Sequence, residues 1–234
     1  MRYGKLKRII ALVIIMSVCW SVPVTSFAAE KEKENGVFRI ALLAHAQLTE
    51  KTDRHSAREK NGIRFSQEFH VYNHSMEEFT ECFLSETRAF YLNEDWECLY
   101  KYCSENIRRI CHIMDIVQPE RMDIAKTRIC NNAEYLLDKD GLCCEVDYAV
   151  RGTIYYNPNS YYISTASTPV RTSLILMGPP QYMITTSHEY AHSSIAANHL
   201  SASFNYSFRV NGYSAWGDPT VFGTTSVSFS IIPD

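Results

Sequence analysis

The sequence has 234 residues, of which 46% are hydrophobic and 21% are charged, close to the average of soluble globular proteins. With 9 Gly, 8 Pro and 12% aromatic residues, the composition excludes collagen-like, coiled-coil and fully disordered classes. The formal net charge is −3, but the first 29 residues contain four basic residues and no acidic one, so residues 30–234 carry −7. A chain this acidic lacks the basic surface of proteins that bind nucleic acids or anionic membranes.

Residues 1–29 have the three-part pattern of a secretory signal peptide. Basic residues are followed by an apolar run at 9–24 and by small residues that end at Ala29. Cleavage is expected after Ala28 or Ala29, because this run is shorter than the roughly 20 residues of a membrane-spanning helix. The segment resembles the signal peptides of Gram-positive bacteria. We therefore expect a bacterial protein that is secreted or associated with the cell envelope, with no membrane span after cleavage.

The composition changes sharply near residue 144. Residues 30–144 contain 21 acidic residues, 16 basic residues and seven cysteines, whereas residues 145–234 contain five acidic residues, three basic residues and neither Lys nor Cys. We therefore divide the mature chain into a polar linker or weakly structured segment at 30–74, a helical, cysteine-containing unit at 75–144 and a β-sandwich at 145–234. The predicted fold class is α+β.

Three helices are predicted in the helical unit. The first starts near Ser75, which together with Glu78 has the spacing of a capping box. In the second, apolar residues recur every three or four positions from Trp96 until Pro119 ends the pattern. The third is expected over about 120–137. These apolar stripes are interpreted as hydrophobic core.

All seven cysteines of the mature chain lie in the helical unit. None of the pairs has CxxC spacing, which argues against a thioredoxin-like redox motif and a zinc ribbon. Because export permits disulfide bonds, we expect at least one disulfide between helices, and the odd number leaves at least one thiol outside an intrachain bond. An alternative is that some, such as Cys103 and Cys111, are small buried hydrophobic residues. The cysteines are Cys82, Cys98, Cys103, Cys111, Cys130, Cys143 and Cys144.

In the last part of the chain, apolar and polar residues alternate with the period of a β-strand. The alternation is uninterrupted over 200–210 and recurs over 227–231, and Gly- and Pro-containing turn sequences separate the segments. Several half-buried strands that are rich in Tyr, Thr and Ser predict an antiparallel β-sandwich.

One short motif carries specific chemistry, because residues 188–192 read HExxH. On a helix, His188 and His192 share a face and can bind one zinc ion, with Glu189 as the general base on a metal-bound water. Over about ten residues the motif resembles the signature of zincin metallopeptidases. This resemblance implies that His188 and His192 are zinc ligands and that Glu189 is the catalytic base.

The surroundings of the motif favour a different interpretation. Ile195 and Asn198 occupy the positions that are Gly and a third ligand in metzincins, no Glu follows the motif, and Asp218 is the remaining ligand candidate. Residues 184–192 alternate as in a strand, where residues four apart are about 13 Å apart, too far for two ligands of one zinc ion. We therefore expect an edge strand, with no cofactor; the zinc site is the alternative.

The binding partner is predicted from aromatic residues that are concentrated after residue 150. They can form a surface that contacts a glycan or a peptide, although Tyr also packs well within sheets. The predicted function is thus a non-enzymatic extracellular module whose β-sandwich binds a protein, peptide or glycan, with a small zinc metallopeptidase as the alternative. A helix over 186–199 would favour the peptidase. The aromatic residues are Tyr155, Tyr156, Tyr161, Tyr162, Tyr182, Tyr213 and Trp216.

Overall fold

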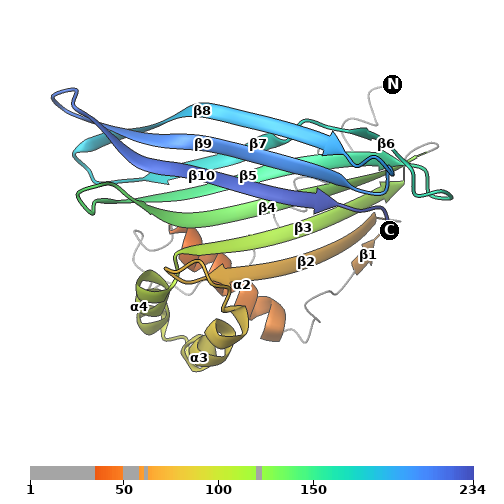
Figure 1. Cartoon of the computed structure of the whole chain (residues 1–234). Helices are drawn as coiled ribbons and strands as arrows, with labels where there is room; N and C mark the ends of the chain where they lie inside the picture. Colours follow the sequence, from red (N-terminus) through yellow and green to blue (C-terminus); the bar gives the residue numbers. More distant parts are fainter. Residues whose placement is uncertain (1–34, 50–57, 61–62, 120–122) are drawn as a thin grey trace, which may run out of the picture.

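The computed structural model describes residues 35–49, 58–60, 63–119 and 123–234. The predicted signal peptide at 1–29 lies outside them. The described chain forms three helices and two antiparallel β-sheets (Figure 1). The helices are α2 (Gly36–Thr49), α3 (Thr80–Leu92) and α4 (Trp96–Asn106).

The larger sheet, sheet A, has seven strands, and the smaller one, sheet B, has three in the order β10-β9-β8. Sheet A runs in the order β1 to β6, with β7 paired to β5. Its strands are β1 (Arg58–Lys60), β2 (Ile63–Tyr72), β3 (Arg109–Pro119), β4 (Ile124–Leu137), β5 (Cys143–Tyr156), β6 (Ile163–Ala166) and β7 (Val170–Met177). Those of sheet B are β8 (Tyr182–Ile195), β9 (Ala202–Ser214) and β10 (Pro219–Ile231).

Two hydrophobic cores lie on opposite faces of sheet A. One fills the space between the sheets, where Tyr148 of β5 packs against Phe208 of β9 with ring centroids 5.1 Å apart. The other lies between sheet A and the helices, with Phe83 of α3, Leu99 of α4 and Ile110 of β3 fully buried. The predicted α+β class is therefore confirmed, with two antiparallel sheets that pack face to face. Sheet A also contains β1 to β4, which precede the predicted sandwich at 145–234, and the helices form a layer on the face of sheet A that is turned away from sheet B (Figure 1).

The second predicted helix is correct only in its first half. As α4 it begins at Trp96, where Asp95 Oδ1 accepts a hydrogen bond from Cys98 N at 3.1 Å, but it ends at Asn106. The following residues form β3, whose Ile110 side chain faces the helices while that of Cys111 faces sheet B. A strand that is buried on both faces has apolar residues at odd and even positions, which hides the two-residue period.

The third predicted helix, at about 120–137, is wrong, because β4 occupies most of this range. On this strand Ala133 faces the helices, and Cys130 and Leu136 face sheet B. The predicted linker at 30–74 contains α2 and β2. The composition step near residue 144 falls at the start of β5, which pairs with β4 along its whole length, so sheet A continues across it.

The predicted disulfide between helices is also wrong for the described chain, because all seven cysteines are free. They are distributed over two helices and three strands, with Cys82 and Cys98 exposed on different helices. Cys103 and Cys111 are buried, which agrees with the alternative that they act as small hydrophobic residues. Burial raises the pKa of Cys103 to about 12, so its thiol stays protonated.

The free edge of β10 is covered by basic side chains from sheet A. Each one donates a hydrogen bond to a backbone carbonyl of β10 or of the residue that follows it. These contacts close one open side of the sandwich and occupy carbonyls that could otherwise pair with another strand. The pairs are Arg109 with Ser226 (3.1 Å), Arg128 with Ser230 (2.8 Å) and Lys126 with Ile232 (3.0 Å).

Candidate functional site

The HExxH residues lie on a strand. β8 pairs with β9 from Tyr182 to Ile195, which confirms the strand predicted at 184–192. The helix that would place His188 and His192 on one face is therefore not formed. Within the described ranges, no group of three or more His, Cys, Asp and Glu side chains is arranged to hold a metal ion.

A β-bulge interrupts β8 inside the motif. The pairing with β9 shifts by one residue between Ser187 and Tyr190, so His188 and Glu189 share one position of the ladder. His188 has a φ of 52°, in the left-handed region that few non-glycine residues adopt. Its Nδ1 lies 2.9 Å from Ser187 Oγ. The bulge takes Glu189 out of the regular alternation of the strand.

Glu189 reaches from β8 toward β9 and β7 at the rim of the sandwich, with 48% of its side chain exposed. Its carboxylate accepts a hydrogen bond from the hydroxyl of Tyr206, a core residue of β9, and lies 3.5 Å from Arg171 Nη2 on β7. The guanidinium of Arg171 in turn lies 5.1 Å from the ring centroid of Phe208. Burial, together with this carboxylate, raises the pKa of Tyr206 well above its usual value. The predicted catalytic base thus closes the side of the sandwich between β7 and β8.

The side chains of sheet B that point away from sheet A form six cross-strand rows, which we call the outer face. In the first five rows, eleven of the fifteen positions are Ser, Thr or Asn, and Arg209 is the only Lys, Arg, Asp or Glu among them. The rows are Ser194–Ser203–Ser230, His192–Asn205–Ser228, Tyr190–Ser207–Ser226, Ser187–Arg209–Thr224, Thr185–Asn211–Val221 and Met183–Tyr213–Pro219.

Hydrogen bonds within the outer face orient its two amide groups. Ser228 Oγ donates to Asn205 Oδ1 at 2.8 Å, and Asn211 Nδ2 donates to Ser187 Oγ at 2.8 Å. Because its oxygen is engaged, Asn205 presents its NH₂ group on the side away from Ser228. The outer face therefore offers donors and acceptors at fixed positions on a rigid sheet.

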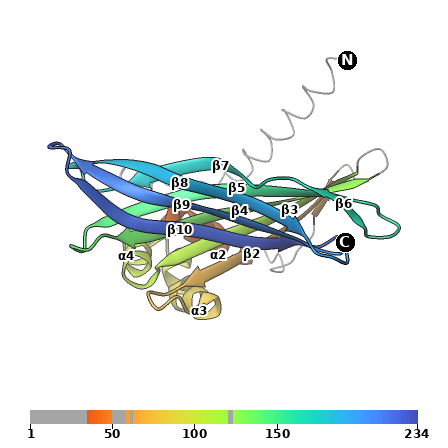
Figure 2. The same ribbon diagram turned by 45° about the horizontal axis from the view of Figure 1, so that its top comes forward.

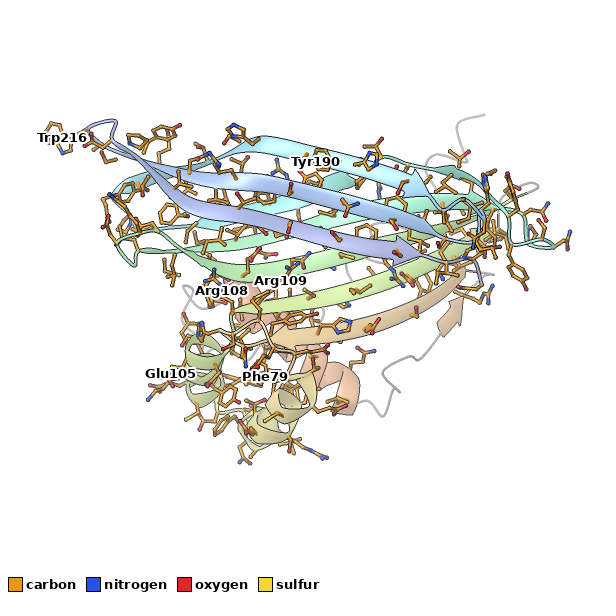
Figure 3. The ribbon with its side chains drawn as sticks, in the orientation of Figure 1. Phe79, Glu105, Arg108, Arg109, Tyr190 and Trp216 are labelled. Atoms are coloured by element: carbon orange, nitrogen blue, oxygen red, sulfur yellow. The ribbon has the colours of Figure 1, made fainter. Side chains whose placement is uncertain are left out.

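Tyr190 stands in the third row of this polar surface, with 55% of its area exposed (Figure 3). The ring of His192 lies beside it, with centroids 6.2 Å apart. Tyr190 thus adds an exposed aromatic ring to a field of hydroxyl and amide groups. Such an arrangement suits a ligand that has many hydroxyl groups and also an apolar face.

The aromatic surface predicted from the sequence is divided by the structure. Tyr156 is buried, whereas Tyr161 and Tyr162 are exposed in the loop before β6. Tyr213 and Trp216 lie at the opposite end of the molecule, by the turn between β9 and β10 (Figure 1). Tyr190 was not among the aromatic residues predicted to form this surface, although the alternation over 184–192 predicts the strand on which it lies.

Comparisons with protein-family models, with curated proteins and with solved structures gave no match. No helix in the described part of the chain is both long and apolar enough to span a membrane. A functional assignment therefore depends on the geometry and chemistry of the outer face.

Proposed function

We propose that the protein is an exported, non-enzymatic binding module whose outer face binds a neutral glycan. The observation that carries this proposal is the exposed ring of Tyr190 within cross-strand rows of Ser, Thr and Asn side chains. A sugar ring has hydroxyl groups around its edge and apolar C–H groups on its faces. The edge would bind the hydroxyl and amide groups of the outer face, and a face would pack on Tyr190.

The charge of this surface favours a neutral ligand. Residues 145–234 contain only five acidic and three basic residues, and Arg209 alone among these lies in the first five rows. Recognition of an acidic polymer relies on several Lys or Arg side chains that neutralise its charges. Neutral hydroxyl groups need only hydrogen-bond partners, which Asn205 and its neighbours supply.

The rigidity of sheet B also supports binding. Ser, Thr, Asn and Tyr have few rotatable bonds, so ordering them at an interface costs less conformational entropy than ordering Lys, Glu or Gln. The inner face of β9 is anchored by Phe204, Tyr206 and Phe208, all in the core between the sheets. The polar groups are therefore preorganised before a ligand arrives.

The proposed location of this module is outside the cytoplasm, in the secreted fraction or on the cell envelope. The support for this is the signal-peptide pattern at 1–29. Extracellular polysaccharides and envelope glycans are then within reach of the outer face.

The test is binding of the purified protein to insoluble neutral polysaccharides, with cellulose, chitin and β-1,3-glucan as probes. We expect binding to at least one of them, and Tyr190→Ala should weaken it by roughly tenfold or more, as for a central aromatic contact. The matched control is Tyr161→Ala, which removes an exposed tyrosine that lies outside the outer face, in the loop before β6. Failure to bind any probe, or equal binding by the Tyr190→Ala variant, would overturn the proposal.

A further inference from the structure

The hairpin formed by β9 and β10 projects beyond the rest of the sandwich and carries a tryptophan at its turn. Figures 1 and 2 show the hairpin extending past the ends of the sheet A strands. Trp216 lies at its apex with 92% of its area exposed (Figure 3). This is the most exposed large hydrophobic side chain of the described residues. Met183, Tyr213 and Val221 are also exposed at this end of sheet B, and a group of exposed apolar side chains is a mark of a contact site.

The turn that carries Trp216 is held by hydrogen bonds. Ser214 Oγ accepts from Trp216 N at 3.2 Å and from Asp218 N at 3.1 Å, and Ser214 O accepts from Gly217 N at 2.9 Å. Gly217 has a φ of 84°, a conformation that glycine adopts without strain. The backbone therefore fixes the tryptophan in its outward position.

Polarity changes in steps from the apex toward the middle of sheet B. Behind Trp216 comes the row that contains Met183, 66% exposed, and Tyr213, 40% exposed. The next row mixes Val221 with polar residues, and the row after it contains Arg209 and hydroxyl groups. Apart from Asp218 in the turn, the aromatic apex, the amphipathic rows behind it and the polar rows beyond them follow the same order as the environments met when leaving a bilayer interface for water.

We propose that this tip, formed by Trp216, Met183, Tyr213 and Val221, inserts into the interface of a lipid bilayer with electrically neutral headgroups. Trp and Tyr are the residues enriched at membrane interfaces, where an apolar ring meets a polar layer. A lipid bilayer can surround a projecting side chain on all sides, whereas a folded protein partner would need a matching cavity to cover it.

The charge of the tip selects the kind of lipid. The turn carries the acidic Asp218, and no Lys or Arg lies in the first two rows behind it, since Arg209 is in the third. Anionic lipids attract clusters of basic residues and repel carboxylates. Together with the net charge of −7 for residues 30–234, this favours zwitterionic headgroups.

This inference goes beyond the proposed glycan binding and uses a different part of sheet B. The 13 residues of β9 span roughly 40 Å at the usual rise of a strand. With the tip in a bilayer, Tyr190 and the rows toward the far end of β9 would remain in water. One molecule could then hold a glycan while it is attached to a membrane.

The experiment is flotation of the exported protein with phosphatidylcholine vesicles. We expect the protein to float with the vesicles. Trp216→Ala should lower the partition coefficient of the protein onto the vesicles by roughly tenfold, because it removes the largest apolar group of the tip. Tyr190→Ala serves as the control that should not change flotation. Adding phosphatidylglycerol should weaken binding, and Asp218→Asn should reduce that sensitivity.

Fluorescence provides a second readout, which reports the environment of the tip itself. Residues 30–234 contain two tryptophans, Trp96 and Trp216, so a Trp96→Phe variant leaves Trp216 as the single reporter. Its emission should shift to shorter wavelength with vesicles and should be quenched by brominated lipid. The membrane proposal would be overturned if the protein did not float with vesicles, or if the Trp216→Ala variant floated as well as the wild-type protein. If the protein did not float and Trp216→Ala instead lost polysaccharide binding, the tip would be assigned to glycan binding.

Discussion

The carboxylate of Glu189 accepts a hydrogen bond from the hydroxyl of Tyr206, a nearly fully buried residue of the adjacent strand. The β-bulge at His188 and Glu189 allows this contact, because it turns the acidic side chain of an edge strand toward Tyr206. A residue whose sequence context resembles a catalytic base therefore contributes to the closure of the sandwich.

The first prediction concerns this contact. Tyr206→Phe should lower the free energy of unfolding by about 1 to 2 kcal/mol, since a hydrogen bond to a half-exposed carboxylate is lost. Glu189→Gln should have a smaller effect, because the amide oxygen can still accept. Urea unfolding of both variants and of the double variant measures the coupling. Strictly additive effects would show that the two side chains do not interact in solution.

The second prediction concerns metal content. Because His188 and His192 lie on a strand, the purified protein should contain far less than one zinc ion per chain, and chelation should leave its melting temperature unchanged. Metal analysis before and after incubation with zinc checks this. About one zinc per chain that is lost in His188→Ala would instead support a zinc site, with peptide hydrolysis by the Glu189→Gln variant as the next measurement.

The third prediction concerns the ion pair that joins β3 and β4 beneath β10. Arg128 Nε and Nη2 each lie 2.6 Å from an oxygen of Asp115, and Arg128 Nη1 donates to Ser230 O. Arg128→Met should destabilise the protein by about 2 to 3 kcal/mol, because it leaves a largely buried carboxylate without this partner.

Chemical denaturation measures this change, and two further variants serve as comparisons. Arg128→Lys should recover only part of the stability, since Lys cannot form the two parallel hydrogen bonds of a guanidinium. Lys101→Ala breaks the exposed pair with Glu105, whose N–O distance is 3.9 Å, and should have no measurable effect. Similar losses for Arg128→Met and Lys101→Ala would show that burial of the Arg128 pair is unimportant.

The fourth prediction concerns the pH dependence of stability. Glu145 of β5 is buried beside the first turn of α2, where its Oε1 accepts from Val37 N at 3.2 Å. Burial raises the pKa of Glu145 to about 7; hydrogen bonds from Val37 and Gly36 oppose this, and the nearby Asp147 adds to it. Arg39, at 2.5 Å from Asp147, provides the adjacent positive charge.

A folded-state pKa above the unfolded value means that the folded state binds the extra proton. The contribution of Glu145 is therefore fully present below about pH 4.5 and is lost as the pH rises toward 7, by up to roughly 3 kcal/mol. Burial lowers the pKa of His45 and His112 to about 4. Their contribution to stability is therefore lost as the pH falls from 6.5 to 4, which is the opposite direction to that of Glu145. The measurement is the difference between the wild-type protein and Glu145→Gln across pH 4 to 8. A difference that does not depend on pH would contradict the prediction.

How far the sequence predicts the fold depends on how each strand is buried. β9 alternates between core residues such as Phe208 and outer-face residues such as Arg209, so its two-residue period is visible. β3 and β4 contact a hydrophobic core on each face, and their inward-facing polar residues, such as Asn132, further obscure the pattern. The dipeptide Asn211-Gly212 is typical of a turn but lies within β9, where the ring of Phe222 approaches Gly212 too closely for a Cβ atom.

The site was predicted only in outline for a related reason. Alternation identified β8 as a strand with one exposed face, and this removed the helix that the HExxH motif requires. It could not show which residues of β9 and β10 stand next to Tyr190, since the register is set by long-range pairing and by the bulge. The inward turn of Glu189 likewise depends on contacts with Tyr206 and Arg171, which are distant in sequence.

The two edges of sheet B are protected against the addition of further strands by different means. Long strands rich in Ser, Thr and Tyr with free edges would readily add to one another when many copies fold in a small volume. Arg109 and Arg128 occupy the carbonyls at the β10 edge, and the bulge at His188 breaks the regular ladder at the β8 edge. Sheet B therefore displays a wide polar surface while both of its edges are blocked against the addition of a further strand.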